Sequence, residues 1–310
     1  MSATEPVEPA APQPVPGRPA ANVQPQGCAC GGGEPASDAG NGFKGYVYAI
    51  GRLRTQFPNT SVSQEFNQAS GRLQTVVPDS WLKAAVLTQG RNAYLARDTC
   101  WVLQVPGPEA AGVSGDPSQA VDAYIIRPRS YVELNALTEA LMPQPGQIVY
   151  VVAIGARGPL APPEACNGLQ LPILIANQIF VFTETDFINN VVASTAIPAQ
   201  SVASTFAKFM SVGDNAGATS EHRALNYLVL RYPNLYTIAD SMLNGSSGAN
   251  TFASISARRA EVQGTREIVE IVLHFVNRVT QIPTFWACKV DTTGQFPFMV
   301  APLQPFYPHP

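Results

Sequence analysis

Two residues of this 310-residue chain could together form a reactive site, Cys166 and His222. Cys166 follows a predicted buried strand and the glycine- and proline-rich stretch 155–164, and rigid loops after buried strands often hold functional groups. His222 lies in the first turn of a predicted helix, where the helix dipole lowers the pKa of an imidazole. A thiol beside a neutral imidazole would suit an enzyme that acts on peptides, so Cys166 and His222 are the catalytic candidates. The alternative is a proline-braced turn at Cys166 that only redirects the chain.

The same two side chains could contribute to a composite zinc site, together with Cys288 or Cys100. Thiolates and imidazoles are the ligands that zinc prefers, so the residue types fit. Their spacing does not support the site, because the chain contains neither H-E-x-x-H nor a pair of C-x-x-C motifs. Zinc is the one cofactor that these residues suggest. Against it, the apolar strands around Cys100 and Cys288 favour thiols that serve as small core side chains.

The remaining thiols and imidazoles suggest no reaction. Cys28 and Cys30 lie one residue apart, and a soft metal would need at least two further ligands that their surroundings do not contain. We expect an inert linker there. His274 flanks the apolar stripe of a predicted helix, and His309 lies in the proline-rich C-terminal end.

Other catalytic signatures are missing from the sequence. Gly155 and Gly158 lack the third glycine of a dinucleotide-binding loop, and neither G-K-[ST] nor G-x-S-x-G occurs. Because no complete set of catalytic residues emerges, we expect a protein that binds rather than one that catalyses.

The net charge of the chain is concentrated in its first 42 residues. Four acidic residues and Arg18 give this segment the whole net charge of -3, while residues 43–310 hold 18 acidic and 18 basic residues. A neutral body argues against nucleic acid and anionic membranes as partners, because both require a basic surface. No run of about 18 apolar residues predicts a transmembrane helix. Residues 1–42 contain no Leu, Ile, Phe, Tyr or Trp and many prolines and glycines, which predicts a disordered tail.

The body has the pattern of an α+β protein, with a mixed sheet region and a more helical C-terminal half that ends in a β-hairpin. Two domains are expected after the tail, at 43–200 and 201–310. Aromatic and β-branched runs predict strands at 46–53, 100–105, 120–126, 147–154 and 171–182, and hairpin arms at 284–290 and 296–301.

Helices are predicted where capping residues precede apolar residues at helical spacing. Ser130 and Glu133 form a capping box, and Thr219 can cap a helix at 220–231. The clearest helical spacing lies at 265–280, where apolar residues follow one another at intervals of three and four. Shorter helices are expected at 80–87, 202–210 and 234–243, and directly after Thr183.

Four stretches occur together and in order, at 46–52 (YVYAIGR), 94–103 (YLARDTCWVL), 155–168 (GARGPLAPPEACNG) and 214–228 (DNAGATSEHRALNYL). With the later Val290-Asp291 and Phe296-Pro297-Phe298, they resemble the C-terminal region of the PatG-type cyanobactin maturation protease family. The resemblance covers roughly residues 43–307 and rests on several long motifs rather than one short pattern. In that family the region follows a subtilisin-like peptidase that macrocyclises ribosomal peptides.

The resemblance implies a stand-alone accessory protein for the modification of ribosomal peptides, because these 310 residues include neither a peptidase nor an oxidase domain. Its partner would be the maturation protease or the precursor peptide. We also expect a homo-oligomer and a cytoplasmic location. The two turn-rich stretches supply the candidates for a binding loop: Arg157, Glu164, Asn167, Asp214 and Asn215.

Overall fold

The structure is a computed structural model that describes residues 45–71, 79–107, 120–142, 147–211, 215–245, 250–260 and 265–307. All of them fall in one unit, Gly42–Pro310. The predictions for the tail at 1–42, including Cys28 and Cys30, and for His309 concern residues outside this description.

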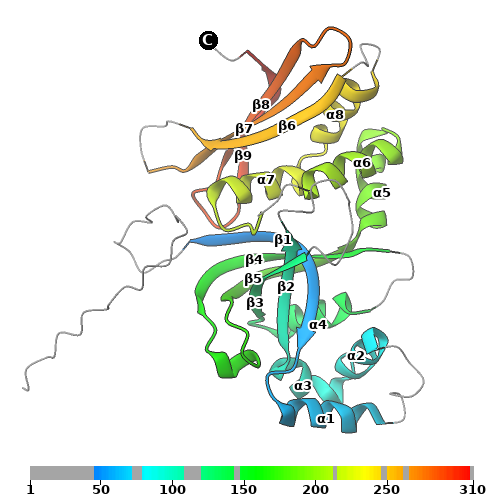
Figure 1. The fold of residues 1–310 in the computed structure, drawn as a ribbon, viewed down its shortest axis with the longest axis vertical. Coiled ribbons are helices and arrows are strands. Elements are labelled where there is room, and N and C mark those ends of the chain that lie inside the picture. The colour runs from blue at the N-terminus through cyan, green and yellow to red at the C-terminus, as the bar shows by residue number, and fades with distance from the viewer. Residues whose placement is uncertain are drawn as a thin grey trace, which may run out of the picture. The chain divides into compact units, whose positions relative to one another are not determined.

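Five strands form a closed barrel in the order β1-β2-β3-β5-β4 (Figure 1). They are β1 (Tyr46–Gln56), β2 (Cys100–Pro106), β3 (Ala120–Arg127), β4 (Val149–Leu160) and β5 (Pro172–Thr183). Neighbouring strands are antiparallel except β3 and β5, which run parallel and pair only from Ile125–Arg127 to Ile173–Ile175. All five predicted strands of this region are confirmed, and the parallel join is the shortest one in the barrel.

Strand β1 is buried on both faces, which explains its nearly unbroken apolar sequence. Val47 and Ala49 point into a core inside the barrel, whereas Tyr48 and Ile50 pack into a second core outside it. Strand β4 alternates in the same way, with Val151 inside and Val152 outside. The barrel wall therefore separates two apolar cores that share these strands.

Four helices add to the core inside the barrel: α1 (Thr60–Ser70), α2 (Asp79–Leu87), α3 (Ala93–Asp98) and α4 (Tyr131–Ala140) (Figure 1). The predicted capping box is present at the start of α4, where Ser130 and Glu133 satisfy each other's backbone N–H groups. Helix α1 is absent from the sequence prediction because Val62 and Phe66 are its only large apolar residues, too few for a helical stripe.

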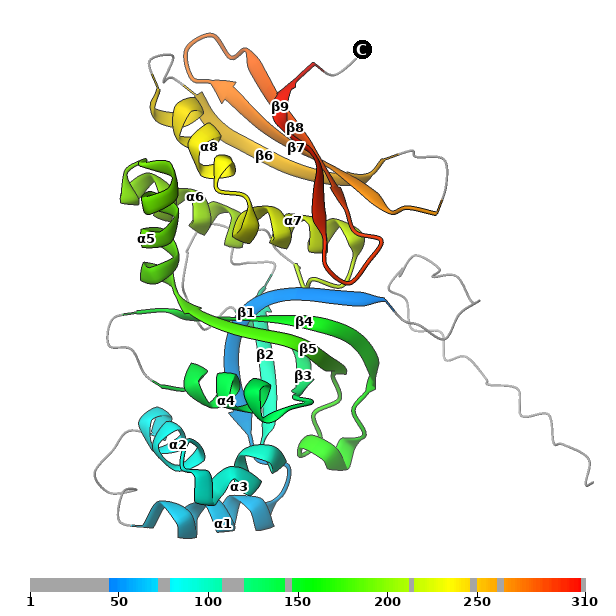
Figure 2. The same ribbon diagram turned by 180° about the vertical axis from the view of Figure 1, so that it is seen from behind.

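The second core is built from the C-terminal half of the chain. Its helices are α5 (Glu184–Thr195), α6 (Ala199–Met210), α7 (Ser220–Arg231) and α8 (Asn234–Asn244). An antiparallel sheet follows, in the order β6 (Asn250–Arg259), β7 (Ile268–Asn277), β8 (Pro283–Asp291) and β9 (Phe298–Phe306). Helix α7 lies between β1 and this sheet (Figures 1 and 2), and its predicted cap Thr219 accepts a hydrogen bond from the His222 backbone N–H at 3.2 Å.

The predicted helix at 265–280 is wrong, because this segment forms strand β7. Its residues also alternate with a period of two, with Val269, Ile271 and Leu273 fully buried and Glu270 and His274 on the other face. β-Branched side chains and pairing with strands on both sides favour the strand over the helix. The predicted final hairpin is therefore one half of a four-stranded sheet, and β6 is a further strand that the sequence pattern did not predict.

The α+β class is confirmed, with a mixed five-stranded barrel and a four-stranded antiparallel sheet. The expected division into domains at 43–200 and 201–310 stays a prediction. No helix among the described residues is both long enough and apolar enough to cross a membrane.

Asp291 gives the last turn of the sheet a pH-dependent stability. Its carboxylate is almost fully buried and accepts hydrogen bonds from the Thr293 backbone N–H (2.8 Å) and from Arg266 (2.6 Å). Burial by itself would raise the pKa of the Asp291 carboxyl, but the hydrogen bonds from Thr293 and Arg266 outweigh it and hold the pKa below its ordinary value. The carboxylate therefore stabilises the fold above the pKa of the unfolded chain, about 3.9, and this contribution is lost as the pH falls through the folded pKa.

Asp291→Asn is expected to lower the free energy of unfolding at pH 7 by about 1–3 kcal/mol, because the charge-assisted hydrogen bonds are weakened. The loss should shrink towards low pH, where the wild-type carboxylate is protonated as well. Urea unfolding at several pH values between about 7 and 3 measures this difference. The exposed Asp98→Asn is the control. An equal loss for Asp291→Asn at every pH would contradict the assignment.

Candidate functional site

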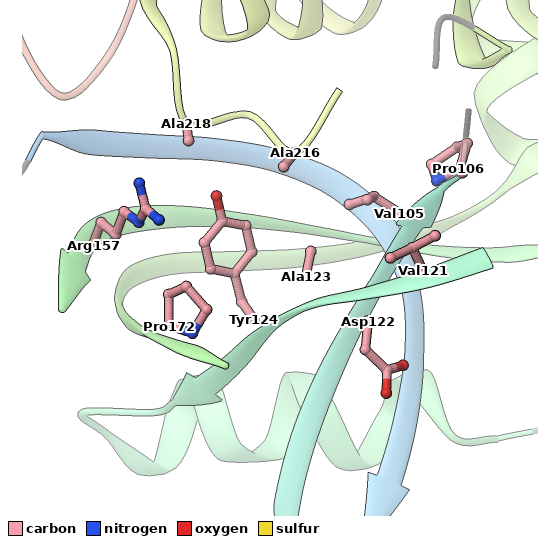
Figure 3. Close-up of a pocket in the computed structure, with 11 residues that line it drawn as sticks. Val105, Pro106, Val121, Asp122, Ala123, Tyr124, Arg157, Pro172, Ala216 and Ala218 are labelled. Carbon is pink, nitrogen blue, oxygen red and sulfur yellow. The ribbon is translucent and has the colours of Figure 1, made fainter. Parts of the chain in front are cut away.

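A pocket of about 250 Å³ opens at the mouth of the barrel (Figure 3). It lies between the adjoining ends of β2 and β3, the far end of β4, the start of β5 and the segment before α7. Its lining consists mainly of small and apolar residues, with three side chains that can form strong polar contacts. The lining residues are Val105, Pro106, Gly107, Val121, Asp122, Ala123, Tyr124, Arg157, Pro172, Ala216 and Ala218.

Arg157 brings a positive charge to this pocket. It lies opposite Leu174 in the antiparallel β4–β5 pair, and residues directly opposite one another share a face of the sheet, here the face of the inner core. Its backbone N–H donates to the carbonyl of Gly45 at 3.1 Å, which joins this end of β4 to the start of β1. The side chain is exposed, and within the described part of the chain it forms no ion pair or hydrogen bond.

Tyr124 supplies a phenol beside this guanidinium. Figure 3 shows the Tyr124 hydroxyl and Arg157 on the same side of the pocket, facing the segment that carries Ala216 and Ala218. Burial raises the pKa of Tyr124 to about 12, although the charge of Arg157 acts in the opposite direction. The phenol therefore keeps its proton at neutral pH and can donate a hydrogen bond to an anion.

Asp122 does not cancel the positive charge at Arg157. Its carboxylate forms an ion pair with Arg54 and accepts a further hydrogen bond from Gln104 at 2.8 Å. Figure 3 shows this carboxylate turned away from Tyr124 and Arg157. Among the described residues that line the pocket, the charge without an ion-pair partner is therefore positive, and the arrangement suits a small anionic group such as a carboxylate.

The segment that covers the pocket is attached to β1 by backbone and amide hydrogen bonds. The Tyr48 backbone N–H donates to the Gly217 carbonyl at 2.9 Å. Asn226 of α7 donates through Nδ2 to the Tyr48 carbonyl and accepts from Asn215 Nδ2, both at 2.7 Å. Two of the stretches that carry the family resemblance, 155–168 and 214–228, thus contribute lining residues to one pocket, and a third, 46–52, hydrogen-bonds to both of them.

Cys166 has a different partner from the one that the catalytic hypothesis requires. It forms a disulfide with Cys100, with a Cα–Cα distance of 5.9 Å, inside a small apolar cluster with Ile125 and Ala161. Both cysteines are 0–1% exposed. In a disulfide neither sulfur is a thiolate, so Cys166 is neither a nucleophile nor a zinc ligand in this structure, and the expectation that Cys100 is an unpaired core thiol is corrected.

His222 and Cys288 lie in the other half of the unit. His222 is in the first turn of α7, as predicted, and Cys288 is a free, buried thiol in β8. Burial raises the pKa of Cys288 to about 12, and the charge of Glu270 adds to this effect. Its thiol therefore stays protonated, as expected for a core side chain. Among the described residues no three of the types His, Cys, Asp and Glu are grouped so that they could hold a metal ion.

The five candidates for a binding loop separate in the structure. Arg157 lines the pocket, and Asn215 supports the covering segment through Asn226. Glu164 and Asn167 are exposed in and just after the short 3-10 helix Pro163–Cys166, where Asn167 adopts the left-handed conformation that ends it. Asp214 falls outside the described residues.

Comparisons with known proteins agree with the motifs. Residues 193–306 match the family model described as PatG C-terminal. Over these residues the chain is similar to the PatG C-terminal family. A solved structure titled "PatG Domain of Unknown Function" has the same fold, with a TM-score of 0.59 and 15% identity over 85% of this chain and 99% of that one. The resemblance inferred from the sequence is thus confirmed, and the likeness to the solved structure concerns the fold. The comparison with curated proteins gave no match.

The pocket contains residues that sequence reasoning did not select. Tyr124 lies in a correctly predicted strand but has no distinguishing neighbours in the sequence, and Ala218 has no chemistry of its own. The period-two alternation of the predicted strand places Tyr124 and Ile126 on the same face, which is the inner face of the barrel. This alternation was the one sequence signal that could have pointed to Tyr124. It is the closure of the barrel that brings this face to a pocket beside Arg157.

Proposed function

We propose that this PatG-like protein is a non-catalytic accessory protein that binds a peptide during the modification of ribosomal peptides. The observation that carries the proposal is the pocket at the barrel mouth, where an exposed arginine that has no ion pair or hydrogen bond to the described residues lies beside a phenol donor. The pocket volume of about 250 Å³ lies below the range of about 300–1,000 Å³ that is usual for drug-sized ligands. This small volume supports a short peptide segment as the ligand. The precursor peptide and an extended segment of the maturation protease are the two partners that we consider.

Binding suits the chemistry of the pocket better than catalysis does. A general base needs a pKa near the working pH, whereas the raised pKa of Tyr124 and the permanent charge of Arg157 suit hydrogen-bond donation. Donors that keep their protons are typical of sites that hold an anion in place. The charge-poor body of the protein is also compatible with a surface that meets another polypeptide.

A randomised pool of fluorescein-labelled hexapeptides tests this function by fluorescence anisotropy. We expect peptides in the pool to bind with a Kd tighter than about 1 mM. Ala218→Trp and Val121→Trp place an indole in the pocket and should each abolish this binding, because both positions line it.

Ala199→Trp, at the exposed start of α6, is the matched control and should bind like the wild type. Circular dichroism confirms that each variant is folded. The proposal fails when no peptide binds, or when the two pocket variants bind as well as the Ala199→Trp control.

A further inference from the structure

The barrel has an unpaired strand edge next to the pocket. Strand β3 pairs with β2 from Ala120 opposite Pro106 to Ile126 opposite Trp101, with one shift of register between Leu103 and Gln104. On its other edge it pairs with β5 only from Ile125 onward, because β5 begins at Pro172. Among the described residues no strand occupies the position beside 120–124, and Val121–Tyr124 line the pocket at that place.

Unpaired strand edges accept extended peptides, whose main chain then continues the sheet. A peptide beside 120–124 of β3 would lie in the same position as β5, ahead of its first residue. It cannot run on past Pro172, because β5 itself occupies the sheet from there. A peptide strand in this position must therefore end at the pocket.

The charge at this point decides which end of the peptide fits. Arg157 and Pro172 both line the pocket beside Tyr124, so the end of the added strand would meet the guanidinium. A peptide's amino terminus is positively charged and would be repelled, whereas its carboxylate can take two parallel hydrogen bonds from arginine. Asp122 adds no repulsion, because its charge is paired with that of Arg54.

We propose that the pocket binds the free C-terminal carboxylate of an extended peptide, with Arg157 and the Tyr124 hydroxyl as its donors and the main chain added parallel to β3. This inference rests on the proposed function and specifies its ligand. The site would distinguish a linear peptide with a free C-terminus from the same peptide with a blocked or cyclised terminus. Specificity for side chains would come from the one or two residues that precede the carboxylate, because the pocket is small.

The test compares one randomised hexapeptide pool in three forms: the free acid, the C-terminal amide and the head-to-tail cyclic peptide, each labelled with fluorescein on a side chain. The free acid is expected to bind roughly 10- to 100-fold more tightly than the other two forms, from the value of hydrogen bonds to a charged group. Arg157→Ala should remove this preference and Tyr124→Phe should reduce it. Arg278→Ala, at an exposed arginine in the turn after β7, should leave it unchanged.

A second comparison tests the added strand. N-methylation of alternate backbone amides in the free-acid pool should weaken binding, because it removes main-chain donors to β3 while leaving the carboxylate intact. Unchanged binding by the methylated acid would overturn the strand addition.

Failure of this inference differs from failure of the proposed function. Acid and amide that bind equally well, or a preference for the acid that survives Arg157→Ala, would overturn carboxylate recognition and leave peptide binding in place. Binding by none of the three forms would remove the proposed function itself.

Discussion

Replacing Gly217 with alanine is expected to lower the free energy of unfolding by about 2–6 kcal/mol, the sum of a backbone and a packing penalty. Gly217 has a φ of +70°, in the left-handed region that glycine adopts without strain. An added Cβ would also collide with the Tyr48 carbonyl oxygen and lie 2.8 Å from the Ala49 Cα. Both neighbours belong to the backbone of β1, which cannot move without opening the barrel.

Gly168→Ala separates the two penalties. Gly168 has a φ of +85°, but a Cβ there would meet nothing within 4 Å, so only the backbone cost of about 1–2 kcal/mol is expected. Urea unfolding of both variants measures the difference. Similar losses for Gly217→Ala and Gly168→Ala would show that the covering segment is not held tightly against β1. Because Ala216 and Ala218 line the pocket, Gly217→Ala should also weaken peptide binding, whereas Gly168→Ala should not.

Removing the disulfide with Cys100→Ala and Cys166→Ala together is expected to lower the free energy of unfolding by about 4 kcal/mol. This value follows from the chain entropy of a loop that joins residues 66 positions apart. The disulfide links the short helix Pro163–Cys166, which follows β4, to β2. It thereby crosses the β3–β5 pairing, which is the shortest pairing in the barrel. A fall in Tm of roughly 10 °C should accompany the change.

The double variant is more informative than a reductant alone, because both sulfurs are buried and react slowly. In the variant, dithiothreitol should have no further effect on Tm. Cys28→Ala with Cys30→Ala is the control and should unfold like the wild type. A double variant at positions 100 and 166 that is as stable as the wild type under oxidising conditions would contradict the prediction. Disulfides are rare in a reducing cytoplasm, so mass spectrometry of alkylated protein from cells would also test the cytoplasmic location that we propose.

Elements with a strong local signal were predicted well. The cap at Thr219 and the capping box at Ser130 each act within one turn of helix, so their residues are adjacent in the sequence. Strand β1 was recognisable because burial on both faces leaves a continuous apolar run. In these cases the chain neighbours contain most of the relevant interactions.

Strand β7 shows where local reasoning fails. Its apolar residues fit a period of 3.6 and a period of two at once, so spacing alone could not distinguish helix from strand. Pairing with β6 on one edge and with β8 on the other stabilises the strand conformation of β7. Strand β6 has too few apolar residues for its own sequence to predict a strand. The deciding hydrogen bonds come from segments that are distant in sequence, which a local pattern does not contain.

The features of the fold and of the candidate site can likewise be divided into those that the sequence predicted and those that only the structure revealed. The sequence by itself determined the α+β class, most of the strands and capped helices and the PatG resemblance, and it gave Arg157 as one of five candidates for a binding loop. Only the tertiary structure decided that Cys166 pairs with Cys100 rather than with His222, and that Arg157 meets Tyr124 at a gap beside β3. The physical reason is barrel closure: β5 joins β3 over a short parallel register, which leaves the edge of β3 open beside the pocket and brings Pro172 and Tyr124 into its lining.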